Sequence, residues 1–158
     1  MTSWDKRSEG FPVNKGQSGS MPEKFSIFEH VRWSDVDRAG IIYYGRFQRL
    51  FEIAETELFR AVGLTYSVLF ERLEVWLPRV QIHTDFRKPL LLDDLAEVQV
   101  HVGNIGNKSL KLVFEVYKDE GQVLTAEGHI ILACVAKDGF EPIRVPEEMR
   151  QKLAPYIA

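Results

Sequence analysis

Residues 44–63 read YGRFQRLFEIAETELFRAVG and carry the one long helical pattern in the chain. Apolar side chains recur there every three or four residues, which is typical of a helix with a buried face. Gly63 stands where a C-terminal cap belongs, and Arg49, Glu52 and Thr56 leave only a narrow polar ridge. We therefore predict a largely enclosed helix over about residues 44–62. Its apolar positions are Phe47, Leu50, Phe51, Ala54, Leu58 and Ala61, widened by Ile53, Phe59 and Val62.

Strand-like alternation of apolar and polar residues occupies most of the rest of the chain. One run precedes the helix, from Lys24 to about Ser34, and places Val31 and Trp33 on the same side. Four more runs follow the helix and are joined by short turns, which makes these strands antiparallel. Their alternating apolar positions are Val80, Ile82, Thr84 and Phe86; Ala96, Val98, Val100 and Val102; Leu110, Leu112, Phe114 and Val116; and Ala126, Ile130, Leu132 and Cys134. With short helices near residues 65–74 and 146–153, this order predicts an α+β fold in which an antiparallel sheet of about five strands wraps around one long central helix.

The composition is that of a single globular domain. The 158 residues are 45% hydrophobic and 27% charged, which suffices for a core without disulfides or metals. We assign this domain to residues 23–158 and predict a disordered tail for residues 1–22, which are rich in turn and linker residues. A net charge of −3 gives no general attraction to nucleic acid or to anionic membranes. One cysteine, no apolar run of membrane-spanning length and no signal core together predict a cytoplasmic protein.

The segment between the first strand and the helix concentrates polar side chains that suit catalysis. It reads Asp35-Val-Asp37-Arg-Ala-Gly40-Ile-Ile-Tyr43-Tyr44, so two carboxylates and a glycine turn come just before a helix start. Unpaired N–H groups at a helix start suit a developing oxyanion, and a nearby carboxylate suits a nucleophile or a general base. The same aspartates also fit a plain turn or a helix cap. An EF-hand calcium loop is excluded, because Arg46 occupies the position that needs a bidentate glutamate.

This segment resembles the active-site motif of the hotdog-fold acyl-CoA thioesterases, in the branch of 4-hydroxybenzoyl-CoA thioesterase. The family pattern is aspartate, any residue, aspartate, two residues, glycine, two apolar positions, an aromatic residue and tyrosine. The match continues in order through Phe51-Glu52, Phe86-Arg-Lys-Pro89, Asp93-Asp94 and Lys108-Ser109-Leu110, and covers about residues 24–150. The resemblance implies a hotdog fold and the hydrolysis of an acyl-CoA thioester to a free acid and CoA. It also implies no further cofactor, because CoA arrives as part of the substrate.

The resemblance assigns catalytic roles at the start of the helix. Asp37 matches the catalytic carboxylate, which acts as a nucleophile or as a general base. The backbone N–H of Tyr44 matches the donor to the thioester oxygen, and Gly40 matches the glycine that lets the turn approach the substrate. The chain departs from the pattern at Gly45-Arg46, where some relatives carry a histidine, so a mechanism that needs this histidine is not supported.

Three further residues match family positions with less specific roles. Glu52 falls near the acyl pocket or a bound water in relatives, and it equally fits an ion pair with Arg49 on the polar ridge. Lys108, followed by Ser109, matches a basic position that meets the phosphates of CoA. A lysine in a hairpin turn also needs no functional explanation.

Other classes of function fit the sequence less well. A non-catalytic hotdog module that binds acyl-CoA or an acyl-carrier partner is an alternative. A hotdog dehydratase or hydratase usually needs a histidine at the site, and none lies between His30 and His83. The chain has no Gly-x-Ser-x-Gly elbow and no histidines at metal-binding spacing, so neither a serine hydrolase nor a metal site is predicted. The resemblance implies a homodimer with active sites completed across the interface, and tetramers as a further assembly, which would also cover an exposed sheet edge.

Overall fold

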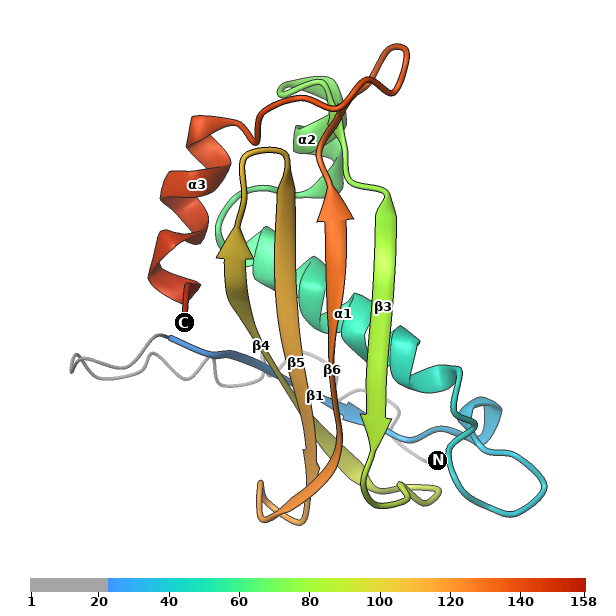
Figure 1. Cartoon of the computed structure of the whole chain (residues 1–158). Coiled ribbons are helices and arrows are strands. Elements are labelled where there is room, and N and C mark those ends of the chain that lie inside the picture. The colour runs from blue at the N-terminus through green and yellow to red at the C-terminus, as the bar shows by residue number, and fades with distance from the viewer. Residues whose placement is uncertain (1–22) are drawn as a thin grey trace, which may run out of the picture.

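Five strands form one antiparallel sheet, and the long helix lies against one face of it. The computed structural model describes residues 23–158. The strands are β1 (Phe25–His30), β3 (Arg79–Phe86), β4 (Leu95–Ile105), β5 (Ser109–Lys118) and β6 (Val123–Ala133), in the spatial order β1-β4-β5-β6-β3. Helix α1 (Arg46–Ala61) runs behind this sheet in Figure 1. The predicted hotdog architecture is therefore confirmed.

Smaller elements lie at the two ends of the sheet. A short 3-10 helix, η1 (Trp33–Asp35), follows β1, and α2 (Tyr66–Glu71) follows α1. A two-stranded sheet pairs β2 (Val75–Trp76) with β7 (Val135–Ala136). The chain ends in α3 (Glu147–Leu153) and a 3-10 turn, η2 (Ala154–Tyr156). Both short helices expected from the sequence are thus present, and each of their ends lies within one turn of the expected position.

The core lies between α1 and the inner face of the sheet. Alternate residues of β4 and β5 are buried there because successive strand side chains point to opposite faces. On the helix side, Phe51 is fully buried and stacks on Phe114 of β5 with ring centroids 4.5 Å apart. The helix positions that the spacing predicted as apolar and that are buried are Phe47, Leu50, Phe51, Ala54, Leu58 and Phe59. Ala61, which the same spacing placed on the buried face, is exposed at the last turn.

The structure corrects the boundaries around the first strand. β1 ends at His30, because the backbone of Val31 leaves the sheet and exchanges hydrogen bonds with Asp93 and Asp94. Trp33 then lies in η1 with 81% of its surface exposed, whereas Val31 is buried, so its predicted place in the strand on the same side as Val31 is wrong. α1 begins at Arg46 and not at about residue 44. The tail predicted for residues 1–22 lies outside the described residues.

No helix within residues 23–158 has both the length and the apolar character needed to cross a bilayer.

Candidate active site

The turn between η1 and α1 is a small closed hairpin. The backbone N–H of Asp37 donates to the carbonyl of Ile41 at 2.9 Å, and that of Gly40 donates to the carbonyl of Asp37 at 3.0 Å. The N–H of Tyr43 donates to the carbonyl of Asp35 at 2.8 Å. Gly40 has a φ of +79°, a left-handed conformation that other residues adopt at a cost. These bonds fix the path of the chain from the end of the first strand to the start of α1.

The buried carboxylate of Asp35 holds the start of this hairpin in place through hydrogen bonds. Its Oδ2 accepts from the backbone N–H of Arg32 at 2.9 Å, and both oxygens accept from the guanidinium of Arg49 at 3.0 and 3.2 Å. Burial opposes ionisation of Asp35, but the bonds from Arg49 and Arg32 outweigh it and hold the pKa of this carboxyl below its usual value. Arg49 also lies 3.6 Å from Glu29. The ion pairs of Arg49 are therefore with Asp35 and Glu29, and the pairing with Glu52 considered from the sequence is wrong.

Asp37 lies at the exposed side of the same hairpin. Its Oδ1 accepts from the backbone N–H of Ala39 at 2.7 Å, which is an ordinary turn bond for aspartate. Within residues 23–158 it forms no ion pair, so its carboxylate is not neutralised by a neighbouring cation. Of the two aspartates in the motif, Asp35 serves the structure of the turn and Asp37 is available to a ligand.

Tyr44 lies at the entrance to α1. The N–H of Arg46 donates to the carbonyl of Tyr43 at 2.8 Å, and the N–H of Phe47 donates to the carbonyl of Tyr44 at 3.3 Å, so the turn passes directly into the helix. Gly45 takes the N-cap position with helical dihedral angles. The amide of Tyr44 therefore precedes the first helical residue by two positions, at the end of α1 where backbone N–H groups and the helix dipole favour negative charge.

A cavity of about 380 Å³ opens beside Tyr44. It is apolar on its inner wall, where Phe47 of α1 and Phe86 of β3 lie with ring centroids 5.4 Å apart. Arg87 and Lys88 also line it, and Lys88 supplies a cation that suits phosphate groups, whereas Arg87 pairs with Glu127 at 2.6 Å. The lining residues are Ile41, Ile42, Tyr44, Phe47, Phe86, Arg87, Lys88 and Pro89. Asp37 is not among them, so in one chain the carboxylate lies on the hairpin and the cavity lies at the helix start.

Glu52, Lys108 and Ser109 lie away from this cavity. Glu52 is exposed on α1 and lines a different cavity, further along the helix. Lys108 is exposed in the turn between β4 and β5, and Ser109 begins β5. Figure 1 shows this turn at the end of the sheet opposite to the hairpin that precedes α1. A single chain therefore does not bring Lys108 or Ser109 to Asp37.

The larger cavity contains a residue that the sequence did not single out. It measures about 570 Å³ and lies between α1, α2, β2 and the start of β3. Glu55 of α1 is fully buried there and accepts hydrogen bonds from Arg79 and Tyr66. A signal for it existed, because Glu55 follows Phe51 by four residues and precedes Phe59 by four, which places an acid on the buried stripe.

Over residues 23–158, no three or more His, Cys, Asp or Glu side chains converge as metal ligands would. The rings of His83 and His129 stack at 5.4 Å, and His83 lies 3.1 Å from Asp85, but all three are strand residues on an open surface.

Comparison with known proteins places the chain in a family. It is 26% identical over 126 residues to the acyl-CoA thioesterase YbgC of Haemophilus influenzae, over 80% of this chain and 91% of that protein. The structure of SAV2348 of Staphylococcus aureus, solved in complex with CoA, superimposes with a TM-score of 0.79 at 18% identity over 89% of this chain and 87% of that one. Slr0204 of Synechocystis, a 1,4-dihydroxy-2-naphthoyl-CoA thioesterase, gives 0.77 at 19% identity, over 84% and 96%. The profile of the Thioesterase-like superfamily matches residues 31–153, and the chain therefore belongs to this superfamily.

Proposed function

We propose that the protein is an acyl-CoA thioesterase, which hydrolyses its substrate to a carboxylic acid and CoA. The superfamily and the name of the Haemophilus influenzae relative support the reaction class. The observation that carries the proposal is the hairpin of residues 35–44, which holds an exposed carboxylate without an ion pair among residues 23–158 and leads directly into the start of α1. These two features supply what hydrolysis of a thioester needs, a nucleophile or base and a donor for the developing oxyanion.

Asp37 is the group that we propose acts on the carbonyl carbon. In one route its carboxylate attacks this carbon, the C–S bond breaks, CoA leaves as the thiol after protonation, and water cleaves the resulting mixed anhydride. In the other route Asp37 removes a proton from water, and the water oxygen attacks the same carbon. The products are the same in both routes, and no metal or redox cofactor takes part in either.

The backbone N–H of Tyr44 is the proposed donor to the thioester oxygen. It lies at the positive end of α1, and the chain around it is held by the hairpin bonds, so the donor needs little reorganisation as charge develops. Loss of one oxyanion donor in other acyl-transfer enzymes lowers turnover by about 10²–10³. A contribution of this size from Tyr44 would not depend on its side chain, which points to solvent.

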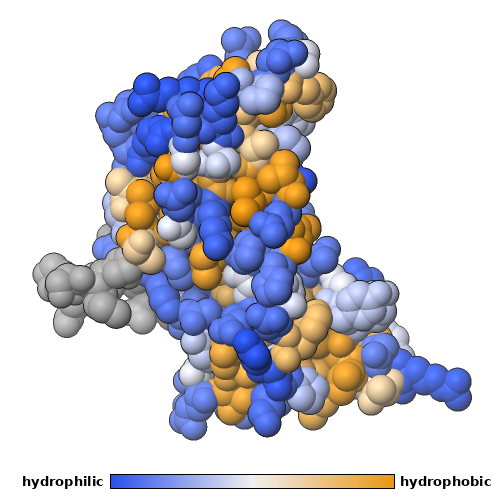
Figure 2. Space-filling view, viewed as in Figure 1, coloured by the Kyte–Doolittle hydropathy of each residue, from blue (hydrophilic) through white to orange (hydrophobic). Residues whose placement is uncertain are grey.

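We further propose that the enzyme is a homodimer paired through β3. β3 is an edge strand of the sheet, and its side chains Val80, Ile82 and Phe86 are 62%, 45% and 53% exposed. Exposed apolar edge strands are normally covered by another chain or by another element. Figure 2 shows hydrophobic patches among hydrophilic ones on the sheet side of the molecule.

A two-fold axis through β3 would also explain the separation of the predicted site residues. In an antiparallel pair of β3 strands, the Arg79 end of one copy lies beside the Phe86 end of the other. The Tyr44 cavity at the Phe86 end would then face the partner's sheet end, which carries its Lys108 and its larger cavity. CoA phosphates could thus meet Lys88 of one copy together with the partner's Lys108.

The test is Asp37→Asn, measured by release of free CoA from a panel of short, long and aromatic acyl-CoAs. Asparagine keeps an oxygen that can accept from the N–H of Ala39, so we expect the melting temperature to stay near that of the wild type. We expect turnover to fall by at least about 10³, because the carboxylate is lost. Asp94→Asn is the matched control, since Asp94 also accepts a backbone N–H in a turn, from Leu91 at 2.8 Å.

The outcomes separate the candidate functions. Near wild-type activity in Asp37→Asn would contradict the catalytic role of Asp37. If Asp37→Asn does not fold, the role of Asp37 is to stabilise the turn. Calorimetric binding of acyl-CoA without any release of CoA by the wild type would favour the non-catalytic binding module.

A further inference from the structure

The larger cavity carries a feature that hydrolysis at Asp37 does not use. Glu55 is fully buried, and its two carboxylate oxygens differ in their contacts. Oε1 accepts from the hydroxyl of Tyr66 and from the guanidinium of Arg79, which lies at 2.5 Å. Oε2 is also buried, and among residues 23–158 no donor reaches it. One oxygen of a buried carboxylate is therefore left to accept a hydrogen bond.

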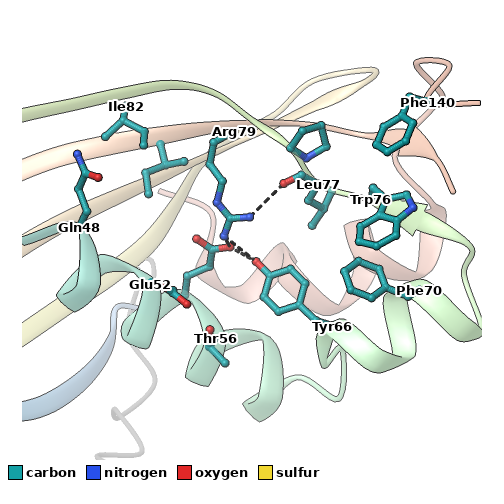
Figure 3. Close-up of a pocket in the computed structure, with 13 residues that line it drawn as sticks. Gln48, Glu52, Thr56, Tyr66, Phe70, Trp76, Leu77, Arg79, Ile82 and Phe140 are labelled. Carbon is teal, nitrogen blue, oxygen red and sulfur yellow. Dashed lines mark hydrogen bonds and ion pairs between the residues drawn. The ribbon is translucent and has the colours of Figure 1, made fainter.

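The surrounding contacts hold this oxygen in place. Arg79 also donates to the hydroxyl of Tyr66 at 3.1 Å and to the carbonyl of Leu77 at 3.2 Å, so both neighbours of Glu55 are fixed. Figure 3 shows the side chains of Arg79 and Tyr66 pointing toward each other across the cavity. Burial raises the pKa of Glu55, although Arg79 and Tyr66 counteract part of this effect. A buried acceptor without a donor costs free energy, which a ligand that supplies the donor would recover.

The rest of the cavity wall is mainly apolar and aromatic. Phe70 lies against Trp76 with ring centroids 4.0 Å apart, and Trp76 stacks on Phe140 at 6.3 Å. Ile82 and Ile130 add aliphatic surface. A volume of about 570 Å³ lies within the range of small-ligand sites, in which a few polar groups on an apolar wall determine orientation.

We propose that this cavity binds the acyl group of the substrate and that Glu55 Oε2 accepts a hydrogen bond from a neutral donor at its far end, a hydroxyl or an amide N–H. We expect this far end of the acyl group, the tip, to be neutral, because Arg79 already balances the charge of Glu55. A carboxylate tip would be repelled by Glu55 and by Glu52, which lines the same cavity. The proposal rests on the proposed function in one respect, which is that the ligand is the acyl part of a CoA thioester.

Two paths lead from the thioester to this cavity. Both cavities lie between α1 and β3, and Glu55 lies about 14 Å along α1 from its first residue, so a long chain can run along the helix within one copy. In a dimer paired through β3, the cavity of the partner lies beside the thioester, and a short acyl group is enough. The identity of the donor at the tip is the same for both paths.

The experiment uses CoA thioethers, which bind as substrates do but cannot be hydrolysed. S-hydroxyalkyl, S-methoxyalkyl and S-alkyl CoA, each at butyl, octyl and dodecyl length, are titrated calorimetrically into the wild type at about pH 8. A hydroxyl can donate to Oε2, whereas a methoxy group can only accept. We expect the hydroxyl tip to bind about tenfold more tightly than the methoxy tip at one length. A preference at dodecyl length identifies the path within one copy, and a preference at butyl length identifies the path between copies.

Glu55→Gln replaces the hydrogen-bond acceptor that faces the tip with a donor. Its amide oxygen remains with the two donors Arg79 and Tyr66, so its NH₂ group replaces Oε2 and now donates. We expect the ratio of hydroxyl to methoxy affinity to fall to about one or below. Glu57→Gln is the control, because Glu57 lies on the exposed side of α1, pairs with Arg60 and should keep the ratio of the wild type.

The results distinguish this inference from the proposed function. Equal binding of all three tips at every length, or no binding of any thioether, overturns the assignment of Glu55, and the comparison of tips in the wild type decides this even if Glu55→Gln does not fold. Absence of CoA release from true thioesters overturns the proposed hydrolysis, whereas the tip preference of the thioethers does not depend on turnover.

Discussion

Asp35 joins three segments of the chain through its side chain and its backbone. Asp35 binds the backbone of Arg32 before it and the guanidinium of Arg49 on α1, and its carbonyl accepts from Tyr43 at the end of the hairpin. It is only 2% exposed, so these bonds are protected from solvent. Hydrogen bonds to a charged buried group are among the stronger polar contributions to stability. Asp35 therefore stabilises the geometry on which Asp37 and the helix start depend.

The ionisation of Asp35 predicts a pH dependence of stability. Because its pKa is lower in the folded protein than in the unfolded chain, the stabilisation is present above the unfolded value of about 4 and is lost as the pH falls through the folded pKa. We expect Asp35→Asn to lower the free energy of unfolding by about 2–3 kcal/mol at about pH 7, measured with urea. The gap between wild type and variant should narrow below about pH 4. A gap that stays constant into this range would show that the charge of Asp35 contributes nothing.

Gly40 predicts a separation between stability and activity. A Cβ at this position meets nothing within 4 Å, so the cost of Gly40→Ala comes only from its φ of +79° and should be about 1 kcal/mol. Gly63, with a φ of +74° at the end of α1, should lose a similar amount on mutation to alanine. We expect only Gly40→Ala to lower kcat for CoA release, because only this turn holds Asp37. Equal losses of kcat in the two variants would contradict this expectation.

Some residues of the candidate site could be predicted from the sequence, and others could not. The resemblance identified Asp37, Gly40 and Tyr44, and the structure places all three on one hairpin and its helix. Glu55 was not singled out, although its spacing from Phe51 and Phe59 places an acid on the buried stripe, because the spacing does not show what the acid contacts. Whether its carboxylate has partners depends on α2 and β3, which are distant in sequence.

At the scale of elements, α1 is held against the sheet by aromatic contact. Phe51 and Phe114 are both fully buried, and their rings stack at an interplanar angle of 16°. Periodicity predicted this helix and the strands β4, β5 and β6 well, because each keeps one buried face. It also predicted β3, but the apolar side chains of that strand are exposed in the single chain. It failed at the end of β1, where backbone hydrogen bonds of Val31 with Asp93 and Asp94 redirect the chain. Such long-range bonds leave no mark on the local alternation of residues.

The contact between α1 and β5 predicts non-additive losses of stability. Phe51→Ala and Phe114→Ala should each lower the free energy of unfolding by about 3–5 kcal/mol, through lost burial and a cavity. The double variant should lose about 1 kcal/mol less than the sum, because the second mutation removes a stack that is already broken. Urea titrations of the four proteins measure this difference. Strict additivity would show that the two rings do not interact.

At the scale of the whole molecule, the sheet has two edges of different character. β1 is one edge, and β3 is the other, with apolar side chains exposed along it. The fold itself could be predicted from local patterns, but an interface depends on a second copy, which no pattern in one chain reveals. The wide separation of Lys108 from Asp37 is the feature of the single chain that most favours assembly.

The edge of β3 predicts the effect of a charge on assembly. Val80→Lys places a cation on this exposed strand, and we expect it to convert a dimer to a monomer in size-exclusion chromatography. Phe28→Lys on β1, where the side chain is 37% exposed, is the control and should remain dimeric. A wild type that elutes as a monomer, or a dimer that survives Val80→Lys and not Phe28→Lys, would contradict pairing through β3.

The closed hairpin before α1 has a consequence for how this sequence can vary in length. Its backbone bonds tie residue 35 to 43 and residue 37 to 41, so an inserted or deleted residue would shift the carboxylate relative to the helix amide. The turn of residues 119–122 between β5 and β6 carries no such constraint from the site. We therefore expect natural variants to accumulate gaps in that distal turn, while the eight-residue interval from 36 to 43 stays constant in every functional descendant.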